Sequence, residues 1–330
     1  MSTGGHDRRS FFRELLRGAS QAAREVDALR RLADDAVRQS TEHGDDPENA
    51  LRPVPAPPAT HLATPEELRS LSADLGRREW AEHALSLART SVRLTPGAGR
   101  GSWLGGGPGV AGLEWPAWNG GELAFVARIG LTELPATPLP KEGALLVFFA
   151  LDRAPSGLRP AEADACRVLH VADVPAGDAH EGALERVPVT PSAELTLPPV
   201  PARLDLDFWE LEEWGGLRER LAGLQGVELE ERASDYHALH RLLGEPDTFA
   251  VDMAVDAHLV SRGVDLEEDP YPDVLDEEVV AGAARWTLLV QLSNDDAVGI
   301  DVGELLRLFV WIHDDDLAAG RFDRVRAFVR

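Results

Sequence analysis

The fold is decided by the stretch "ELAFVARIGLTELP", residues 122–135, and by "GALLVFFALD", residues 143–152, which follows it. Both segments are nearly continuous apolar runs, and neither alternates between apolar and polar positions. Short runs of this kind, bounded by glycine and proline, are typical of β-strands. Because a strand with one solvated face alternates, these two segments predict central strands that are covered on both faces.

Working outward, five further segments are short and rich in β-branched or aromatic residues, and helical segments stand before and between them. This mixture predicts a single β-rich α+β domain rather than a series of βαβ units. The further strand segments are "SVRLTP" (91–96), "ACRVLHVAD" (165–173), "RWTLLVQLSND" (285–295), "LRLFVWIHD" (306–314) and "VRAFVR" (325–330), and the helical segments are 64–75, 77–90 and 207–244.

Two short motifs indicate an internal duplication. "LGGGP" (104–108) and "LLGEP" (242–246) share the pattern Leu-x-Gly-x-Pro. Each precedes an apolar strand, then a glycine and a second apolar strand, and Arg128 and Gln291 fall at matching places. The recurring order of these features favours a duplicated β unit. We expect half-repeats at about 91–175 and 236–330, packed around a shared interface.

The same residues carry a family resemblance. The first block resembles the signature of the YwqG-like family, a domain of unknown function, and the second block is similar to its later part. The resemblance covers roughly residues 90–330 and implies an α+β fold with coiled or bifurcated, mostly antiparallel sheets. It implies no established reaction. The matching positions are Gly106 to Pro108, Trp115-Pro116, Leu123 to Pro135 and Leu139 to Phe149, followed by His240, Gly244 and Pro246.

The departures from the family pattern fall on polar positions. Arg128 stands where the family usually has glutamine, and Glu304 stands where it usually has aspartate within a Trp-Gly-Asp-x-Gly motif. If these positions serve a ligand, the ligand or its affinity has changed in this chain. If they are structural, the fold has compensated.

The composition limits the classes of partner. The chain has 57 acidic against 33 basic side chains, a formal net charge of −24. This charge repels polyphosphates and anionic lipids, so we expect no nucleic-acid partner and no membrane association. Cys166 is the only cysteine, which excludes an intramolecular disulfide and suits a reducing compartment. We therefore expect a cytoplasmic protein with an unknown protein partner or a small ligand.

Residues 1–60 are expected to form a helical arm and a Pro-rich linker, ahead of a domain at 61–330. Apolar residues within 11–37 recur at spacings of three and four, which predicts one seam along a helix. Alanine fills half of this seam, so the helix either packs on its own domain or supports weak self-association. The linker at 40–60 should be extended and mobile. The domain begins with a capping box at 64–67, and we expect the arm and linker to be dispensable for folding.

No catalytic constellation is recognisable in the sequence. Ser102 lacks the G-x-S-x-G context of a nucleophile elbow. The glycines of 104–109 lack the lysine of a phosphate loop and predict a turn with positive φ. Residues 293–304 resemble a calcium loop, but they would place Val298 and Leu305 at ligand positions. We expect no metal ion and no cofactor.

Six residues are candidates for contact with a ligand or a partner. An arginine within an apolar strand cannot be buried unpaired, because desolvating a lone ion costs several kcal/mol. For Arg128 we expect a carboxylate partner, with Glu304 as the nominee, and a bound anion is the alternative. His237 and His240 have helix-like spacing, and His240 is interpreted as structural. The candidates are Trp103, Trp115, Arg128, His240, Gln291 and Glu304.

These features predict a protein-interaction or small-ligand-binding protein. The alternative is an uncharacterised enzyme of the hydrolytic class. Its site would lie in the cleft between the two half-repeats, because interfaces between like halves are common places for ligand sites. Binding is preferred because no group of catalytic residues is recognisable.

Overall fold

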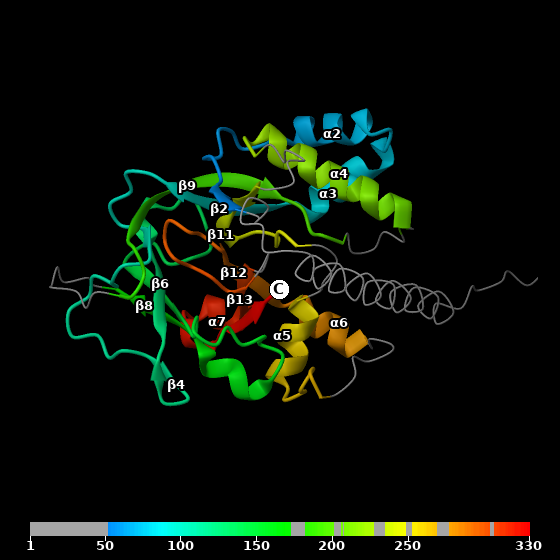
Figure 1. Ribbon diagram of the computed structural model, residues 1–330. Helices are drawn as coiled ribbons and strands as arrows, with labels where there is room; N and C mark the ends of the chain where they lie inside the picture. The colour runs from blue at the N-terminus through cyan, green and yellow to red at the C-terminus, as the bar shows by residue number, and fades with distance from the viewer. Residues whose placement is uncertain are drawn as a thin grey trace, which may run out of the picture.

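The computed structural model describes residues 52–172, 182–200, 206, 208–227, 235–248, 253–268, 277–303 and 307–330 (Figure 1). A ten-stranded sheet, antiparallel at every neighbouring pair, forms its centre. The order of the strands is β14 (Arg326–Val329), β13 (Arg307–His313), β12 (Trp286–Ser293), β11 (His240–Leu243), β2 (Arg89–Pro96), β9 (Val187–Thr196), β3 (Trp103–Leu104), β6 (Ala124–Gly130), β7 (Ala144–Phe149) and β8 (Cys166–Val171).

One face of this sheet turns onto a single apolar core, to which all ten strands contribute side chains. The sheet is therefore coiled and nearly closed. β6 and β7 are buried along almost their whole length, which confirms the prediction of two central strands covered on both faces. Each fully buried aliphatic or aromatic side chain contributes about 1.5–3 kcal/mol to folding, so this core is the main source of stability.

The sheet consists of two four-stranded meanders, β3-β6-β7-β8 and β11-β12-β13-β14, which are separated by β2 and β9. In the first meander Trp103 pairs with Arg128, and in the second Arg241 pairs with Gln291. Arg128 and Gln291 thus occupy the same place in the two registers. The short strand of each meander also leads into two consecutive residues at positive φ, which are Gly105 and Gly106 in one and Leu243 and Gly244 in the other.

The two meanders share an irregularity as well. The register shifts directly after Phe125 in β6 and directly after Leu288 in β12. Before these shifts Phe125 pairs with Phe148, and Leu288 pairs with Trp311. In register, therefore, Trp311 of the second meander corresponds to Phe148 of the first.

The bulge in β6 changes which side chains share a face. In a regular strand Leu123, Phe125 and Ala127 would share one face. In β6, Phe125 joins an apolar cluster outside the sheet together with Trp103, whereas Ala127 lies in the core. Arg128 points outward, on the side of the Trp103 ring.

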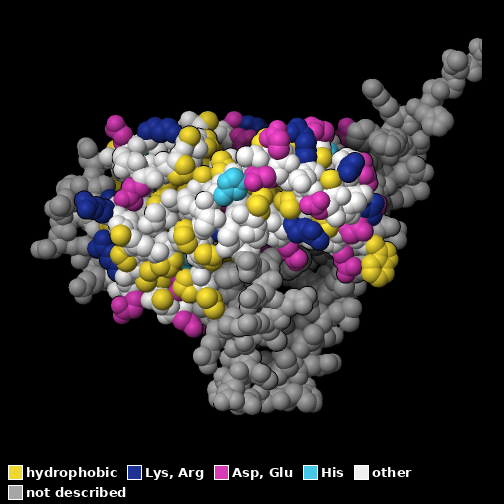
Figure 2. Space-filling view, turned by 90° about the horizontal axis from the view of Figure 1, so that it is seen from above, with side chains coloured by type: hydrophobic (Ala, Val, Ile, Leu, Met, Phe, Trp, Pro, Cys, Tyr) yellow, Lys and Arg dark blue, Asp and Glu magenta, His cyan; other side chains and the backbone are white. Residues whose placement is uncertain are grey.

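Helices cover the outer face of the sheet, as Figure 1 shows. α2 (Pro65–Asp74), α3 (Ala81–Leu87) and α4 (Phe208–Leu224) pack together over β9, and the surface above them mixes acidic, basic and apolar side chains (Figure 2). Among the described residues, every helix falls short of the length and apolar character needed to span a bilayer. The remaining helices are α5 (Met253–Ser261), α6 (Glu277–Ala283), α7 (Asp314–Ala318), η1 (Arg78–Trp80), η2 (Leu131–Glu133), η3 (Pro160–Ala165) and η4 (Phe322–Arg324).

Side chains cap two of the helices, and the cap of α2 confirms the capping box that the sequence predicts at 64–67. Thr64 and Glu67 form the capping box of α2, each side chain accepting a hydrogen bond from the other residue's backbone N–H. His313 ends β13 and its side chain accepts from the backbone N–H of Asp315, so it caps α7. Both caps are set by neighbours in the sequence.

The interpretation of residues 235–243 as the end of a helical insertion is wrong. β10 (Asp235–Ala238) pairs with β1 (Arg52–Pro55) in a parallel two-stranded sheet, and β11 lies between β2 and β12. All four residues of β11 are buried. The helix-like spacing of the two histidines was overridden by pairing with strands that are distant in the sequence. A further small sheet joins β4 (Ala117–Trp118) to β5 (Gly121–Glu122).

The predicted helical arm, including residues 11–37, lies outside the described residues. The last part of the predicted linker, residues 52–60, packs against the domain. The carbonyl of Pro57 accepts a hydrogen bond from Arg93, and the N–H of Ala59 donates to Ser192. These nine residues therefore contact the domain, and the first four of them are extended, as strand β1.

Candidate functional site

Arg128 is held by the backbone of its own meander. Its Nε donates to the carbonyl of Gly101 at 3.2 Å, and its Nη1 donates to the carbonyl of Pro108 at 3.0 Å. The guanidinium carbon lies 4.8 Å from the centre of the Trp103 ring. Burial, followed by the positive charge of Arg186, lowers the pKa of Arg128. The expected carboxylate partner, Glu304, lies outside the described residues.

Gln291 performs the same task in the second meander. Its Nε2 donates to the carbonyl of Leu239 at 3.1 Å, and its Oε1 accepts from the N–H of Asp247 at 2.9 Å. Leu239 lies two residues before Arg241, the register partner of Gln291, as Gly101 lies two residues before Trp103. In both meanders one polar side chain thus connects the entry of the short strand to the loop that follows it.

His240 is buried between two polar neighbours. Its Nδ1 accepts from the N–H of Ser293 at 3.4 Å, and its Nε2 lies 3.1 Å from a carboxylate oxygen of Asp295. Burial opposes ionisation of Asp295, but the contact with His240 and the backbone N–H groups that face the carboxylate hold its pKa below the ordinary value. At the matching place in the first meander the Ser102 hydroxyl accepts from the N–H of Gly130 at 3.0 Å.

The two candidate tryptophans are also satisfied by backbone carbonyls. The indole N–H of Trp103 donates to Gly107 at 2.9 Å, and that of Trp115 donates to Leu123 at 2.8 Å. Trp115 packs edge-on against Phe148, with ring centres 5.3 Å apart. The candidate residues therefore fall into two groups, one in each meander, and the structure does not bring them together in one site.

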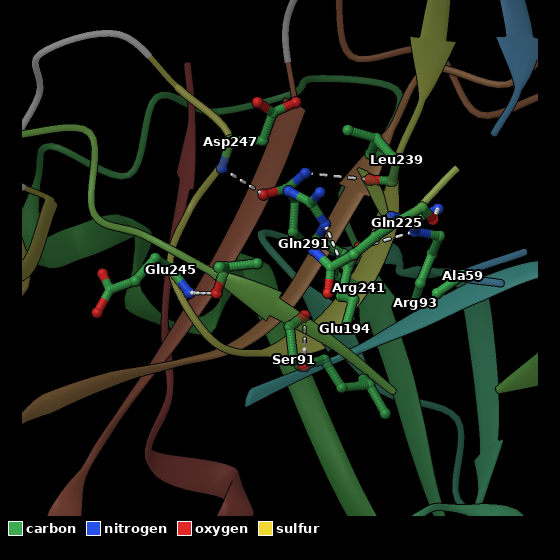
Figure 3. A network of polar contacts seen from close by, with 12 residues as sticks. Ala59, Ser91, Arg93, Glu194, Gln225, Leu239, Arg241, Glu245, Asp247 and Gln291 are labelled. Carbon is green, nitrogen blue, oxygen red and sulfur yellow. Dashed lines mark hydrogen bonds and ion pairs between the residues drawn. The ribbon is translucent and has the colours of Figure 1, made fainter. Parts of the chain in front are cut away.

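A buried ionic network lies where the two meanders meet β2 and β9 (Figure 3). Arg93 of β2 and Arg241 of β11 stand directly opposite each other, and Glu194 of β9 lies between their guanidinium groups. Nε of Arg93 donates to Oε2 of Glu194 at 2.7 Å, and Nε of Arg241 lies 2.5 Å from Oε1. The three side chains are 0%, 7% and 1% exposed, respectively.

A cavity of about 70 Å³ adjoins this network beneath α4 and is partly open to solvent. Strand β9, helix α4 and the segment around β11 form its walls. Gln225, at the end of α4, fastens the helix to β9 through hydrogen bonds to both backbone groups of Leu195. The lining residues are Glu194, Leu195, Thr196, Leu197, Gly215, Arg218, Glu219, Leu221, Ala222, Gln225, Val227, Leu239, Arg241, Glu245 and Asp247.

The arginines around the cavity differ in how their donors are used. Arg218 donates to three backbone carbonyls, those of Leu197, Pro246 and Thr248. Arg93 donates to two carbonyls besides its carboxylate partner. Arg241 also lines the cavity. Its Nε and Oε1 of Glu194 form an ion pair, but both atoms are buried without a hydrogen bond of good geometry among the described residues.

The lining of the cavity carries charges of both signs. Arg218 and Arg241 share it with Glu194, Glu219, Glu245 and Asp247, and Asp247 is paired with Arg307 at 3.3 Å. Burial opposes the charged form of Arg241, but Glu194 and then Asp247 raise the pKa of this guanidinium. The side chain therefore stays protonated beside its carboxylate partners.

The polar side chains of the lining are carboxylates, guanidinium groups, one amide and one hydroxyl. Its described residues include Thr196 and four acidic side chains, but no serine, cysteine or histidine. The one cysteine, Cys166, is buried in the core, and burial raises the pKa of its thiol to about 12. Across the described ranges, no three histidine, cysteine, aspartate or glutamate side chains gather in a metal-binding arrangement.

Sequence reasoning missed this network because its members look like the solvated residues of ordinary strands. Arg93 lies within "SVRLTP", Glu194 within "SAELTL" and Arg241 within "HRLL". A charged residue in a strand is more often on a water-facing side. The available signal was weak: Arg93 and Arg241 each interrupt a short apolar segment, as Arg128 does.

Comparison with protein families gives one match. The profile described as "Domain of unknown function (DUF1963)" matches residues 102–329. No curated protein matches the chain.

Proposed function

Since the chain belongs to the family described as a domain of unknown function, DUF1963, we propose from its own geometry that it is a small-ligand-binding protein whose site is the cavity beneath α4. The observation that carries this proposal is the buried ion pair of Arg241 with Glu194 in the lining, in which Nε of Arg241 and Oε1 of Glu194 have no hydrogen bond of good geometry among the described residues. A buried donor without a partner costs about 1–3 kcal/mol, and a ligand would recover this free energy.

Binding of a small molecule is favoured over the two other readings of the sequence. A protein partner would need an exposed surface, whereas this buried ion pair lines a cavity of about 70 Å³. A hydrolase commonly pairs a serine or cysteine nucleophile with a histidine base, and the described lining contains none of these three residue types, although its carboxylates can accept a proton. A cytoplasmic location is part of this proposal and is supported by the single, buried cysteine.

We also propose that the chain is YwqG-like within its family and arose by duplication of a β unit. The support is the common register of Arg128 and Gln291, the paired bulges and the matching hydrogen bonds of these two side chains. Superposing residues 103–149 on residues 240–313 tests the duplication. Different strand directions or connections in a structure determined by crystallography would argue against it.

The binding proposal can be tested with a variant that fills the cavity. Gly215 lines it from α4, and a Cβ added there meets no atom within 4 Å, so Gly215→Leu fits the helix while its side chain occupies the opening. Gly216→Leu is the matched control, because its Cβ also meets no atom within 4 Å and Gly216 is outside the lining.

The assay is the thermal unfolding midpoint of the full chain with a panel of small organic acids, amino acids, amines and sugars. We expect at least one compound to raise the midpoint of the wild type and of Gly216→Leu but not that of Gly215→Leu. The proposal fails if no compound raises the midpoint, or if every increase persists in Gly215→Leu.

A further inference from the structure

The outer side of α4 exposes large apolar side chains at both of its ends. Trp209 is 69% exposed and Leu224 is 37% exposed. At 3.6 residues per turn, Trp209, Arg220, Gly223 and Leu224 lie on one side of the helix. A Cβ added at Gly223 meets no atom within 4 Å, so no described side chain lies over the helix at this point.

The exposed apolar side chains continue onto the segment that leads into α2. Leu62 is 45% exposed and precedes Ala63, whose N–H donates to Oε1 of Gln225 at 3.3 Å. Because Gln225 follows Leu224, Leu62 lies at the same end of α4 as Leu224. Exposed apolar side chains that gather in one place mark interaction sites. We call these residues the α4 surface: Trp209, Arg220, Gly223, Leu224 and Leu62.

We propose that the α4 surface binds residues 11–37 of the same chain, through the apolar seam that the sequence predicts along this segment. The proposal does not depend on a ligand in the cavity beneath α4. Its support is the place where the described chain begins, the charge of the two parts and the tether between them. The residues of the seam are Phe12, Leu15, Ala19, Ala22, Val26, Leu29, Ala33 and Ala36.

The described chain begins beside the α4 surface. Ala56 packs with Val227 and with Ala222 of α4, so the first described residues lie at the C-terminal end of this helix. Residues 38–51 connect the seam to Arg52, and an extended chain of this length reaches at most about 50 Å. α4 has 17 residues and is about 25 Å long, so the seam can reach every part of the α4 surface.

The charges of the two parts are opposite. Residues 1–31 carry seven arginines against four acidic side chains, within a chain whose net charge is −24. The helices α2, η1, α3 and α4 together carry nine acidic side chains against four arginines. Complementary charges favour contact between the basic segment and the acidic helical layer, and like charges oppose contact between two such layers.

The tether favours the chain's own segment over a second copy. Alanine fills half of the seam, so the contact buries little apolar area. Association of two chains must offset the loss of translational and rotational freedom, whereas a segment on a short linker is present at an effective concentration in the millimolar range. A weak contact of this kind therefore forms within one chain before it forms between two.

The test measures how fast a maleimide modifies a thiol on the α4 surface of the full chain. Gly223→Cys supplies this thiol, and the native Cys166 is buried in the core. Two glutamates are then introduced into the seam, as Ala22→Glu with Leu29→Glu. The matched control is Gln21→Glu with Ala28→Glu, which adds the same charge with the same spacing on the other side of the expected helix.

We expect the seam glutamates to speed modification of Gly223→Cys at least fivefold, because they release the segment from the α4 surface. The control pair should change the rate less than twofold. Ala318→Cys, at an exposed position of α7, should react at the same rate in all three backgrounds. The rates should not depend on protein concentration.

Four outcomes overturn the inference. An unchanged rate with the seam glutamates would show that the segment does not cover α4, and equal effects of the two glutamate pairs would show that the seam is not the contact. An equal acceleration at Ala318→Cys would mean that the segment supports the whole fold rather than the α4 surface. Protection that is lost on dilution would assign the covering segment to a second copy.

Discussion

Replacement of Arg128 tests whether this side chain is a structural connector. Arg128 is 7% exposed and donates to the carbonyls of Gly101 and Pro108, on the two sides of β3. Arg128→Ala removes two hydrogen bonds from a charged donor, each worth about 1.5–3 kcal/mol, and the contact with Trp103, worth about 0.5–2 kcal/mol. Removing a buried charge recovers part of this loss, because burial disfavours the ion. We expect a net destabilisation of about 2–4 kcal/mol.

Arg128→Gln separates the hydrogen bonds from the charge. Gln291 connects the corresponding parts of the second meander with a neutral amide. Glutamine at position 128 should therefore retain at least one connection, and we expect it to cost less than about 1.5 kcal/mol. Arg186→Ala is the matched control, because Arg186 also lies over Trp103, at 3.7 Å, but is exposed, so its loss should cost under about 1 kcal/mol.

Urea denaturation of the wild type and the three variants measures these differences as shifts of the midpoint at constant slope. The order of stability should be wild type, Arg186→Ala and Arg128→Gln close together, and Arg128→Ala well below them. The reasoning is refuted if Arg128→Ala unfolds within 0.5 kcal/mol of the wild type, an approximate limit of detection. It is also refuted if Arg128→Gln is as unstable as Arg128→Ala, since the neutral amide would then restore nothing.

Three more outcomes are expected. Glu194→Gln should lower the free energy of unfolding by about 3–5 kcal/mol, because it leaves two buried guanidinium groups without a carboxylate. Glu219→Gln, in the lining of the same cavity, should leave the free energy of unfolding unchanged. Equal effects of the two substitutions in urea denaturation would contradict the buried network. The capping hydrogen bonds of Thr64, and then His61, lower the pKa of Glu67 from 4.5 to about 2. A carboxyl group whose pKa is lower in the folded state stabilises the fold at pH values above its unfolded-state pKa, and this stability is lost as the pH falls through its folded-state pKa. Glu67→Gln should therefore flatten the decline in stability between about pH 5 and 2. An unchanged profile of stability against pH would rule this out. Because burial raises the pKa of Cys166 to about 12, a thiol reagent should modify it only at the rate of global unfolding, and rapid labelling of the folded protein would show that the core opens there.

The parts of the fold that were predictable from the sequence have local or strongly apolar signals. The runs at 122–135 and 143–152 were recognisable as covered strands because no polar alternation interrupts them. The cap at Thr64 depends on residues three positions apart. Strand β9 was not predicted, since Pro188 and Pro191 argue against a strand, and only its pairing with β2 and β3 accounts for it.

The candidate site was not predictable because its residues meet only through the topology. Arg93, Glu194 and Arg241 lie on three strands that are far apart in the sequence. Trp103, Arg128 and Gln291 were singled out as candidates for contact with a ligand or a partner, and the groups they contact in the structure are backbone carbonyls that no sequence pattern reveals. The sequence indicated in which strand each polar residue lies, but not which groups would surround it.

The position of β2 has a consequence for how the chain reaches its native state. Within each meander, neighbouring strands lie closer together along the chain than β2 lies to β9 or β11, so their pairing closes shorter loops and can form earlier. β2 instead pairs with β9 and β11, and the contact of Arg93 with Glu194 spans 101 residues. Closing such loops carries a larger entropic cost, so the two meanders should assemble before β2 joins them. The arginines and the glutamate would then remain hydrated until this last step, and their dehydration would belong to the slowest barrier of folding.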